Sequence, residues 1–161
     1  MSSPRRPNLE LLEYTITLAV ENVRGGKGGP FAALVAMDGK VIAEGVNLVT
    51  STNDPTAHAE VVAIRRACEA LGTFQLTGAE LYTSCEPCPM CLGAIFWARP
   101  AVVFYAATCI EAAAAGFDDA LIYRQIALPG DQRIIPMIHV PTPRSGHSFE
   151  TWRHQRQRVD Y

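Results

Sequence analysis

Helical and strand-like hydrophobic patterns alternate along this chain, and that alternation restricts its possible folds more than any other feature of the sequence. Two apolar runs, residues 31–37 and 41–45, are separated by Asp38-Gly39, a dipeptide typical of β-hairpins. Because helices inserted between strands cover both faces of a sheet, the order predicts an α/β fold, a three-layer α/β/α sandwich with a mixed central sheet. The other predicted elements are helices from the Asn8 cap to Gly25 and at residues 56–71, 88–98, 108–115 and 148–159, and strands at 79–83, 101–106 and 134–140.

The end of the sequence departs from this regular pattern. The apolar run at 134–140 contains Pro136, which restricts a strand there to an edge of the sheet. Pro141, Pro143 and Gly146 then form a linker to a basic helix. We therefore expect one folded domain over residues 1–146 and a C-terminal helical tail over residues 147–161.

Two short segments each open a predicted helix and carry side chains that bind metals. The first is His58-Ala59-Glu60 and the second is Pro87-Cys88-Pro89-Met90-Cys91. Cys88 and Cys91 are three residues apart, so both sulfurs emerge on one side of a helix, and the helix dipole favours their thiolate forms. With the His58 imidazole they make a set of three ligands for one Zn²⁺ ion per subunit.

The number of ligands separates structural zinc sites from catalytic ones. Structural sites are closed by four protein ligands, whereas catalytic sites leave one position for water. No convincing fourth ligand is present, because Cys85 precedes the helix and Cys109 is distant along the chain. Glu60 is two residues from His58, so on an ideal helix the two side chains diverge and do not bind one ion together. We expect Glu60 to be the general acid and base that moves the protons of an activated water.

Two other interpretations of the cysteines stay open at this point. A Cys-x-x-Cys segment in a cytosolic α/β protein can be a redox pair, although a redox pair does not explain the neighbouring prolines or the His-x-Glu segment. A zinc site can also be purely structural in a non-catalytic binding module. That alternative predicts a fourth protein ligand and no release of ammonia from any base.

Composition bears on the compartment and on the partners. The net charge of −2 provides no basic field for nucleic acid, which argues against such a partner. Three of the five cysteines fall within seven residues, a spacing that indicates a reduced, cytoplasmic protein and no disulfide scaffold. No segment approaches the ~20 apolar residues of a membrane span. No apolar run follows the charged residues 1–7, and a helical pattern that contains glutamates follows instead, so we expect no signal peptide.

The His-x-Glu and Pro-Cys-x-x-Cys segments together match the signature of the zinc-dependent nucleobase deaminases. The chain resembles the cytidine-deaminase-like superfamily and, within it, the small bacterial guanine deaminases. The similarity runs from Gly28 to Tyr161, and its densest stretches are residues 53–60, 82–95 and 115–119, followed by Trp152-Arg153 and Tyr161.

This resemblance implies roles for further residues. It makes Asp119 a second acid that assists Glu60 in moving protons. It also implies a purine base as the substrate and a homodimer in which the C-terminal tail is exchanged between subunits. On the substrate side it implies that Asn47 binds the purine edge, that Phe31 lines the ring, that Trp97 lies near the pocket wall and that Tyr161 closes the active site of the partner subunit.

The reaction implied is the hydrolytic deamination of guanine to xanthine and ammonia, in purine catabolism or salvage. The alternative is a tRNA adenosine deaminase, or another nucleobase or nucleoside deaminase with the same zinc chemistry. A tRNA substrate requires a basic face, and both the acidic net charge and the Phe117-Asp118-Asp119 segment argue against it.

Overall fold

The computed structural model of the protein describes residues 6–161. Residues 1–5, which belong to the predicted first domain and to the segment tested for a signal peptide, lie outside the described residues. The chain divides into two compact units, the first ending at Asp119 and the second spanning Ala120–Tyr161. The predicted division at residue 146 stays a prediction. No helix among the described residues has the length and apolar character that a membrane crossing requires.

The first unit is built on a four-stranded mixed sheet with the order β2-β1-β3-β4. Strand β1 is antiparallel to both β2 and β3, whereas β3 and β4 are parallel. Asp38 and Gly39, between β1 and β2, both have positive φ angles, of 51° and 76°, as the predicted tight hairpin requires. The four strands are β1 (Ala32–Met37), β2 (Lys40–Val46), β3 (Glu80–Cys85) and β4 (Val102–Ala107).

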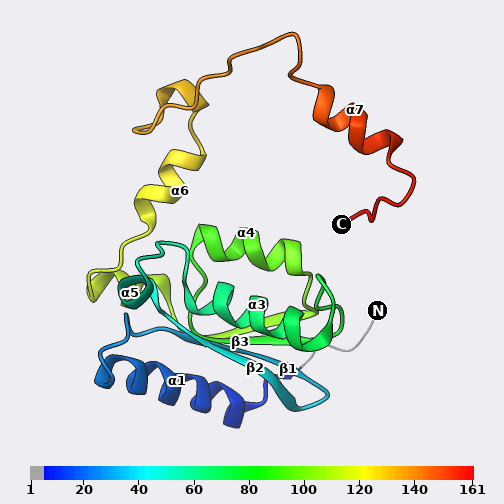
Figure 1. The fold of residues 1–161 in the computed structure, drawn as a ribbon. Helices are drawn as coiled ribbons and strands as arrows, with labels where there is room; N and C mark the ends of the chain where they lie inside the picture. The colour runs from blue at the N-terminus through cyan, green and yellow to red at the C-terminus, as the bar shows by residue number, and fades with distance from the viewer. Residues whose placement is uncertain (1–5) are drawn as a thin grey trace. The chain divides into compact units, whose positions relative to one another are not determined.

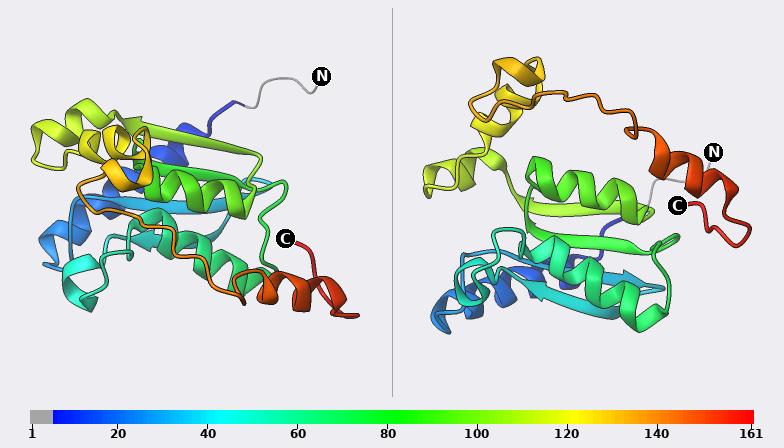
Figure 2. Two further views of the ribbon diagram at one scale, coloured as in Figure 1. Left: turned by 90° about the horizontal axis from the view of Figure 1, so that it is seen from above. Right: turned by 45° about the horizontal axis from the view of Figure 1, so that its top comes forward.

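Helices cover both faces of this sheet, which confirms the predicted three layers (Figure 1). Helix α1 (Leu9–Arg24) packs on one face, and helices α3 (Ala59–Leu71) and α4 (Pro89–Ala98) lie side by side on the other (Figure 2). The alternation along β1 explains the arrangement. Ala33 and Val35 belong to the core beneath α3 and α4, whereas Leu34 and Ala36 belong to the core beneath α1.

The predicted helix boundaries are confirmed where a cap or a glycine marks them. Asn8 caps α1 by accepting a hydrogen bond from the Glu10 amide at 3.0 Å. Helix α3 ends at Gly72, whose φ of 62° is left-handed. The predicted start of α3 at residue 56 is wrong, because Asp54 accepts hydrogen bonds from the amide and hydroxyl of Thr56 and holds that residue in a turn.

Several short elements complete the chain. The one-turn helix α2 (Val49–Thr52) follows β2, and helix α5 (Cys109–Ala114) begins with a capping box between Thr108 and Glu111. The second unit contains α6 (Ala120–Ile126), the 3₁₀ turn η1 (Gly130–Gln132) and α7 (His147–His154), so the C-terminal helix ends earlier than the predicted residue 159.

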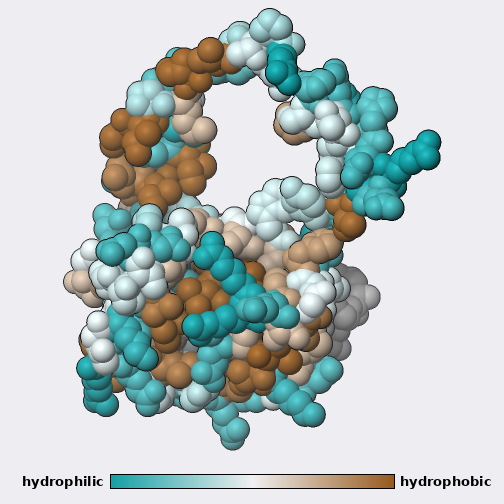
Figure 3. All heavy atoms as spheres, in the orientation of Figure 1, coloured by the Kyte–Doolittle hydropathy of each residue, from teal (hydrophilic) through white to brown (hydrophobic). Residues whose placement is uncertain are grey.

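The predicted strand over residues 134–140 is wrong. The structure has no strand there, and Met137 instead donates its amide to the Gly130 carbonyl at 2.9 Å. A strand needs a neighbour to share its hydrogen bonds, and the second unit supplies none among its described residues. The apolar side chains of this segment are left exposed, and Figure 3 shows the hydrophobic surface over α6 and the residues that follow it.

Candidate active site

Three predicted metal ligands meet in the first unit. The Nδ1 atom of His58 lies 3.5 Å from the sulfur of Cys88 and 3.5 Å from the sulfur of Cys91. The three ligand atoms all lie within 4.8 Å of one another. One tetrahedral zinc ion, with bonds of ~2.0–2.1 Å to nitrogen and ~2.3 Å to sulfur, requires an N···S separation of about 3.5 Å. The donor set therefore fits zinc in both chemistry and spacing.

The ends of two helices bring these ligands together. His58 is the N-cap of α3 and Cys88 is the N-cap of α4, each with an extended backbone, while Cys91 lies in the first turn of α4. Pro89, at the first helical position of α4, favours a helix start there because its ring already has a helical φ. A residue at the N-cap lies in front of the helix axis, so the imidazole and the two sulfurs face one point between the two helix starts.

The N-cap position of His58 also explains the placement of Glu60. Because His58 lies outside the helix, the divergence of positions i and i+2 on an ideal helix does not separate the two side chains. Glu60 is 6% exposed, and its Oε2 atom accepts a hydrogen bond from the Cys91 thiol at 3.3 Å. The proposed proton carrier therefore borders the ligand cluster directly.

The electrostatics of the cluster stabilise a thiolate. A hydrogen bond from the Cys91 thiol, helped by His58, lowers the pKa of Cys88 to about 4, while the same pairing with Cys88 raises the pKa of Cys91. The hydrogen bond with Cys88 raises the pKa of His58. Burial raises the pKa of Glu60, which favours a carboxyl group that can hold a proton.

Asp119, the last residue of the first unit, lies within electrostatic reach of the cluster. Partial burial raises the pKa of its carboxyl group, and the negative charge of Cys88 raises it further. The segment leading to Asp119 also contacts Phe31, the residue predicted to line the purine ring. The ring of Phe117 packs edge-on against Phe31, with centroids 4.9 Å apart and planes at 87°. Phe117 is not among the predicted site residues, although it lies in the 115–119 segment that resembles the guanine deaminases.

Asn47 is buried at the end of β2, and its side chain already has partners. Its Oδ1 atom accepts hydrogen bonds from the amides of Gly29 at 3.2 Å and Val49 at 3.3 Å.

Glu86 is a second residue that sequence reasoning missed. Its carboxylate accepts the Cys109 amide at 3.0 Å and so ties the loop that precedes Cys88 to the start of α5.

The other two predicted substrate residues are Trp97 and Tyr161. Trp97 is 64% exposed on the outer side of α4. Tyr161 belongs to the second unit, where its ring packs against Trp152 with centroids 6.5 Å apart. The roles of Trp97 and Tyr161 in binding a base stay predictions.

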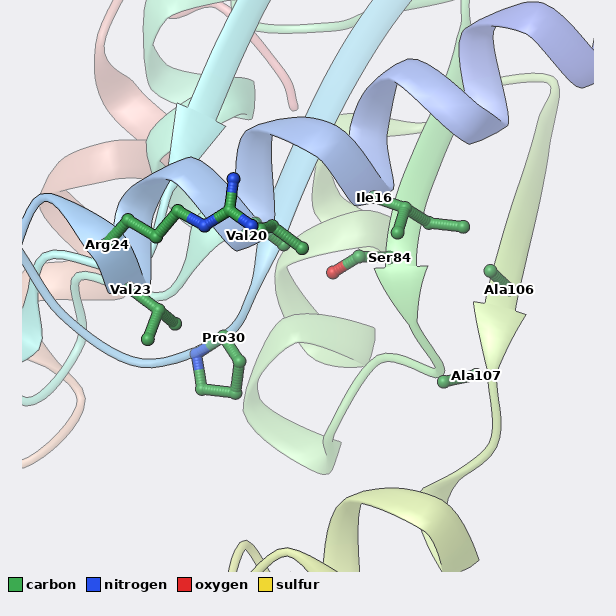
Figure 4. Close-up of a pocket in the computed structure, with 9 residues that line it drawn as sticks. Ile16, Val20, Val23, Arg24, Pro30, Ser84, Ala106 and Ala107 are labelled. Atoms are coloured by element: carbon green, nitrogen blue, oxygen red, sulfur yellow. The ribbon is translucent and has the colours of Figure 1, made fainter.

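A cavity of ≈ 460 Å³ lies elsewhere in the first unit, between α1 and the ends of β3 and β4 (Figure 4). Its lining is mostly aliphatic, with Arg24 and Ser84 as the polar members. None of the predicted site residues lines it, and Ser84 and the preceding Tyr82 face the α1 side of the sheet. This cavity is therefore separate from the ligand cluster.

Comparison with known proteins gives consistent relatives. Residues 8–107 match the family model of the cytidine and deoxycytidylate deaminase zinc-binding region. The chain is 55% identical to guanine deaminase of Bacillus subtilis over 93% of this chain and 96% of that protein. The X-ray structure of a Bacillus subtilis guanine deaminase superposes with a TM-score of 0.95 at 52% identity, covering 97% of this chain and 99% of that one.

A second relative matches a shorter part of the chain. The tRNA-specific adenosine deaminase of Agrobacterium fabrum is 50% identical over 48% of this chain and 51% of that protein. That match covers about half of each protein, whereas the guanine deaminase match extends across nearly the whole chain. With its fold, its ligand cluster and more than half of its length accounted for, the chain belongs to the cytidine and deoxycytidylate deaminase family of zinc-binding enzymes.

Proposed function

We propose that this protein catalyses the zinc-dependent hydrolytic deamination of guanine to xanthine and ammonia, in purine catabolism or salvage. The observation that carries the proposal is the buried carboxyl group of Glu60 beside a cluster of only three metal ligands. The family of the chain is a zinc deaminase family, and the relative with the longest match described above is a guanine deaminase.

We assign His58, Cys88 and Cys91 as the residues that hold the zinc ion. When bound there, zinc supplies a Lewis acid that makes hydroxide available at neutral pH. His58 contributes a neutral nitrogen through Nδ1, and the lowered pKa of Cys88 prepares one of the two thiolates. A fourth protein ligand is absent from the described cluster, which leaves room for a reacting water.

Glu60 moves protons in the proposed reaction. Its carboxylate accepts a proton from the attacking water and delivers it to the ring nitrogen next to the amino-bearing carbon, C2 of guanine. The hydroxyl group now on C2 then gives up the second proton of the water, Glu60 delivers it to the amino group, and the carbon–nitrogen bond breaks to release ammonia and leave the C2 carbonyl of xanthine. The raised pKa of Glu60 suits this exchange, because it makes the carboxylate a better proton acceptor that can still return the proton. Asp119 assists at the leaving amino group.

In the proposed site, the purine base is held by residues other than the metal ligands and the two acids. Phe31 offers an aromatic ring to the flat base, and Phe117 supports that ring from its edge. Asn47 can serve the purine edge only through its amino group, since its oxygen is bound to two backbone amides. Trp97 contributes to the wall of the pocket, and Tyr161 of the partner subunit closes it.

We further propose a cytoplasmic homodimer in which the tails are exchanged. The second unit has no buried residue, and its segment at 134–140 exposes an almost continuous apolar surface. In the first unit, β4 is an edge strand, and α4 exposes Leu92, Phe96 and Trp97. No membrane-spanning helix is found among residues 6–161, and apolar area of this kind favours burial against a second copy. A monomeric mass at micromolar concentration would contradict this proposal.

One experiment tests the proposed reaction against its alternatives. Purified, metal-analysed protein is incubated with guanine, guanosine, cytosine, adenine and a tRNA anticodon stem, and ammonia release is measured for each. We expect one zinc per chain and the highest kcat/KM for guanine. Turnover of the tRNA stem with none of guanine would replace the proposal with the tRNA deaminase alternative. Absence of ammonia from every substrate would support a non-catalytic zinc module.

A further inference from the structure

Asn22 is a buried amide on the wrong side of the sheet to touch a substrate. It lies on α1, is 3% exposed, and α1 packs on the face opposite α3 and α4. Its Nδ2 atom donates two hydrogen bonds of 2.9 Å, one to the carbonyl of Gly29 and one to the carbonyl of Asn47. The bond to Asn47 joins residues that are far apart in sequence and holds the turn after β2.

The orientation of the Asn22 amide is fixed by its surroundings. Both groups that face its NH₂ are carbonyl oxygens, so a flipped amide would set oxygen against oxygen. Its own Oδ1 atom is buried and has no hydrogen-bond partner among the described residues. A buried acceptor without a partner costs free energy, and the two donated bonds are what offset that cost.

These two bonds reach the residues proposed to bind the base. Gly29 donates its amide to Oδ1 of Asn47 and accepts the Phe31 amide at 2.9 Å, and Asn47 donates its own amide to the Phe31 carbonyl at 3.0 Å. Asn22 is therefore hydrogen-bonded to Gly29 and Asn47, the two residues whose backbones are also hydrogen-bonded to Phe31. Asn22, Gly29, Phe31 and Asn47 are called the base-side junction below.

The backbone is closely packed next to this junction. A Cβ atom on Gly28 would overlap the carbonyl oxygen of Asn47, so the backbones are in contact there. A Cβ on Gly29 would lie 3.4 Å from the Phe31 ring and 3.6 Å from the Asn47 side chain. We therefore expect a shift of the Asn47 carbonyl to move the Asn47 side-chain amide and the Phe31 ring as well.

We infer that Asn22 is a positioning residue for substrate binding, which acts through the Asn47 and Gly29 carbonyls and touches neither the base nor the metal ligands. This inference rests on the proposed function, because it assigns the base to the Asn47 and Phe31 side of the site. It separates base binding from zinc binding, since no bond of Asn22 reaches α3 or α4.

Two variants test it against a matched control. Asn22→Asp keeps the shape but faces the two carbonyls with a carboxyl group, which is repelled when ionised and can donate only one bond when protonated. Asn22→Ala removes both bonds while strengthening the helix. The control is Thr15→Val, which removes a fully buried hydroxyl of the same helix whose only bond is to the Leu11 carbonyl within that helix.

The expected result is a split between kinetic constants. Both Asn22 variants raise KM for guanine by about tenfold or more with kcat within about threefold of wild type, because ground-state and transition-state binding are weakened equally. Zinc content stays at the wild-type value, and Thr15→Val leaves both constants unchanged. If one Asn22 variant does not fold, the other still decides the outcome.

A second readout does not depend on the substrate. Amide hydrogen exchange should accelerate at Gly29, Phe31, Asn47 and Val49 in the Asn22 variants, and it should stay unchanged across residues 59–71 and 89–98. If the wild-type protein deaminates a base other than guanine, only the proposed substrate fails and the same KM comparison is made with that base. Equal KM values in wild type and both variants, or exchange that accelerates across the whole first unit, would overturn the positioning role.

Discussion

The two compact units differ in how much of their structure they bury. The first unit has a sheet, two cores and every buried residue of the described chain, whereas the second unit, residues 120–161, buries none of its side chains. The first also contains all the ligands of the metal cluster. From this contrast we expect the first unit to hold zinc by itself, and the second unit to need an apolar surface from outside itself.

The largest effect is expected from the metal cluster. Cys91→Ala removes a buried ligand and the thiol that pairs with Cys88, so we expect loss of zinc and of all measurable deamination. Metal analysis and ammonia release measure this directly. Removal of zinc by a chelator should lower the unfolding temperature of the first unit, and zinc added back should restore it. Full zinc occupancy in the Cys91→Ala protein would show that the cluster has been wrongly assigned.

Glu60→Gln should lower kcat by about 10²–10⁴-fold, because an amide cannot carry the proton between water and base. Zinc content should remain at the wild-type level, since Glu60 is not one of the three ligands. Glu111→Gln is a suitable control, because that exposed carboxylate only caps α5. Full turnover by a zinc-loaded Glu60→Gln protein would refute the assigned role.

A chain that ends at Asp119 tests the contrast between the two units itself. We expect it to fold cooperatively, to bind zinc and to lose roughly 10²-fold in kcat/KM, because the proposed closure of the site by Tyr161 is missing. Circular dichroism, metal analysis and kinetics would be compared with the full chain. An unfolded or zinc-free fragment would show that the first unit is not self-sufficient.

The smallest effect concerns Phe117, whose edge packs on Phe31. Replacement by Leu removes an aromatic pair worth about 0.5–1.5 kcal/mol, and we expect KM for guanine to rise severalfold with kcat little changed. Tyr14→Leu serves as the control, because it removes an exposed aromatic ring of α1 whose hydroxyl donates to Glu44. A KM unchanged by Phe117→Leu would separate the 115–119 segment from base binding.

The sequence predicts well what is encoded over a few residues. The caps at Asn8 and Gly72, the hairpin at Asp38-Gly39 and the ligand pair Cys88 and Cys91 each depend on local chemistry, and each is placed as expected. The three layers follow from the same short patterns, because alternation in one strand already separates the two faces of the sheet.

What the sequence does not reveal depends on distant partners. Asn22 looks like an ordinary polar helix residue until Asn47 is found beside it, and Phe117 acquires a partner only when Phe31 is placed. The strand predicted at residues 134–140 is wrong for the opposite reason. The apolar run has the local pattern of a strand, but it lacks the neighbouring strand that would share its hydrogen bonds. Helix α3 begins late because the Asp54 turn competes for the same residues.

The first positions of α3 and α4 have a consequence for engineering this protein. His58 and Cys88 occupy the places where most helices carry a capping serine or aspartate, and neither side chain makes a capping bond. Substitutions chosen to improve these helix starts would raise the intrinsic stability of the helices and remove the metal at once. Substitutions meant to raise the thermal stability of this protein should therefore be made at other positions, because at these two a stabilising helix cap has been given up for metal binding.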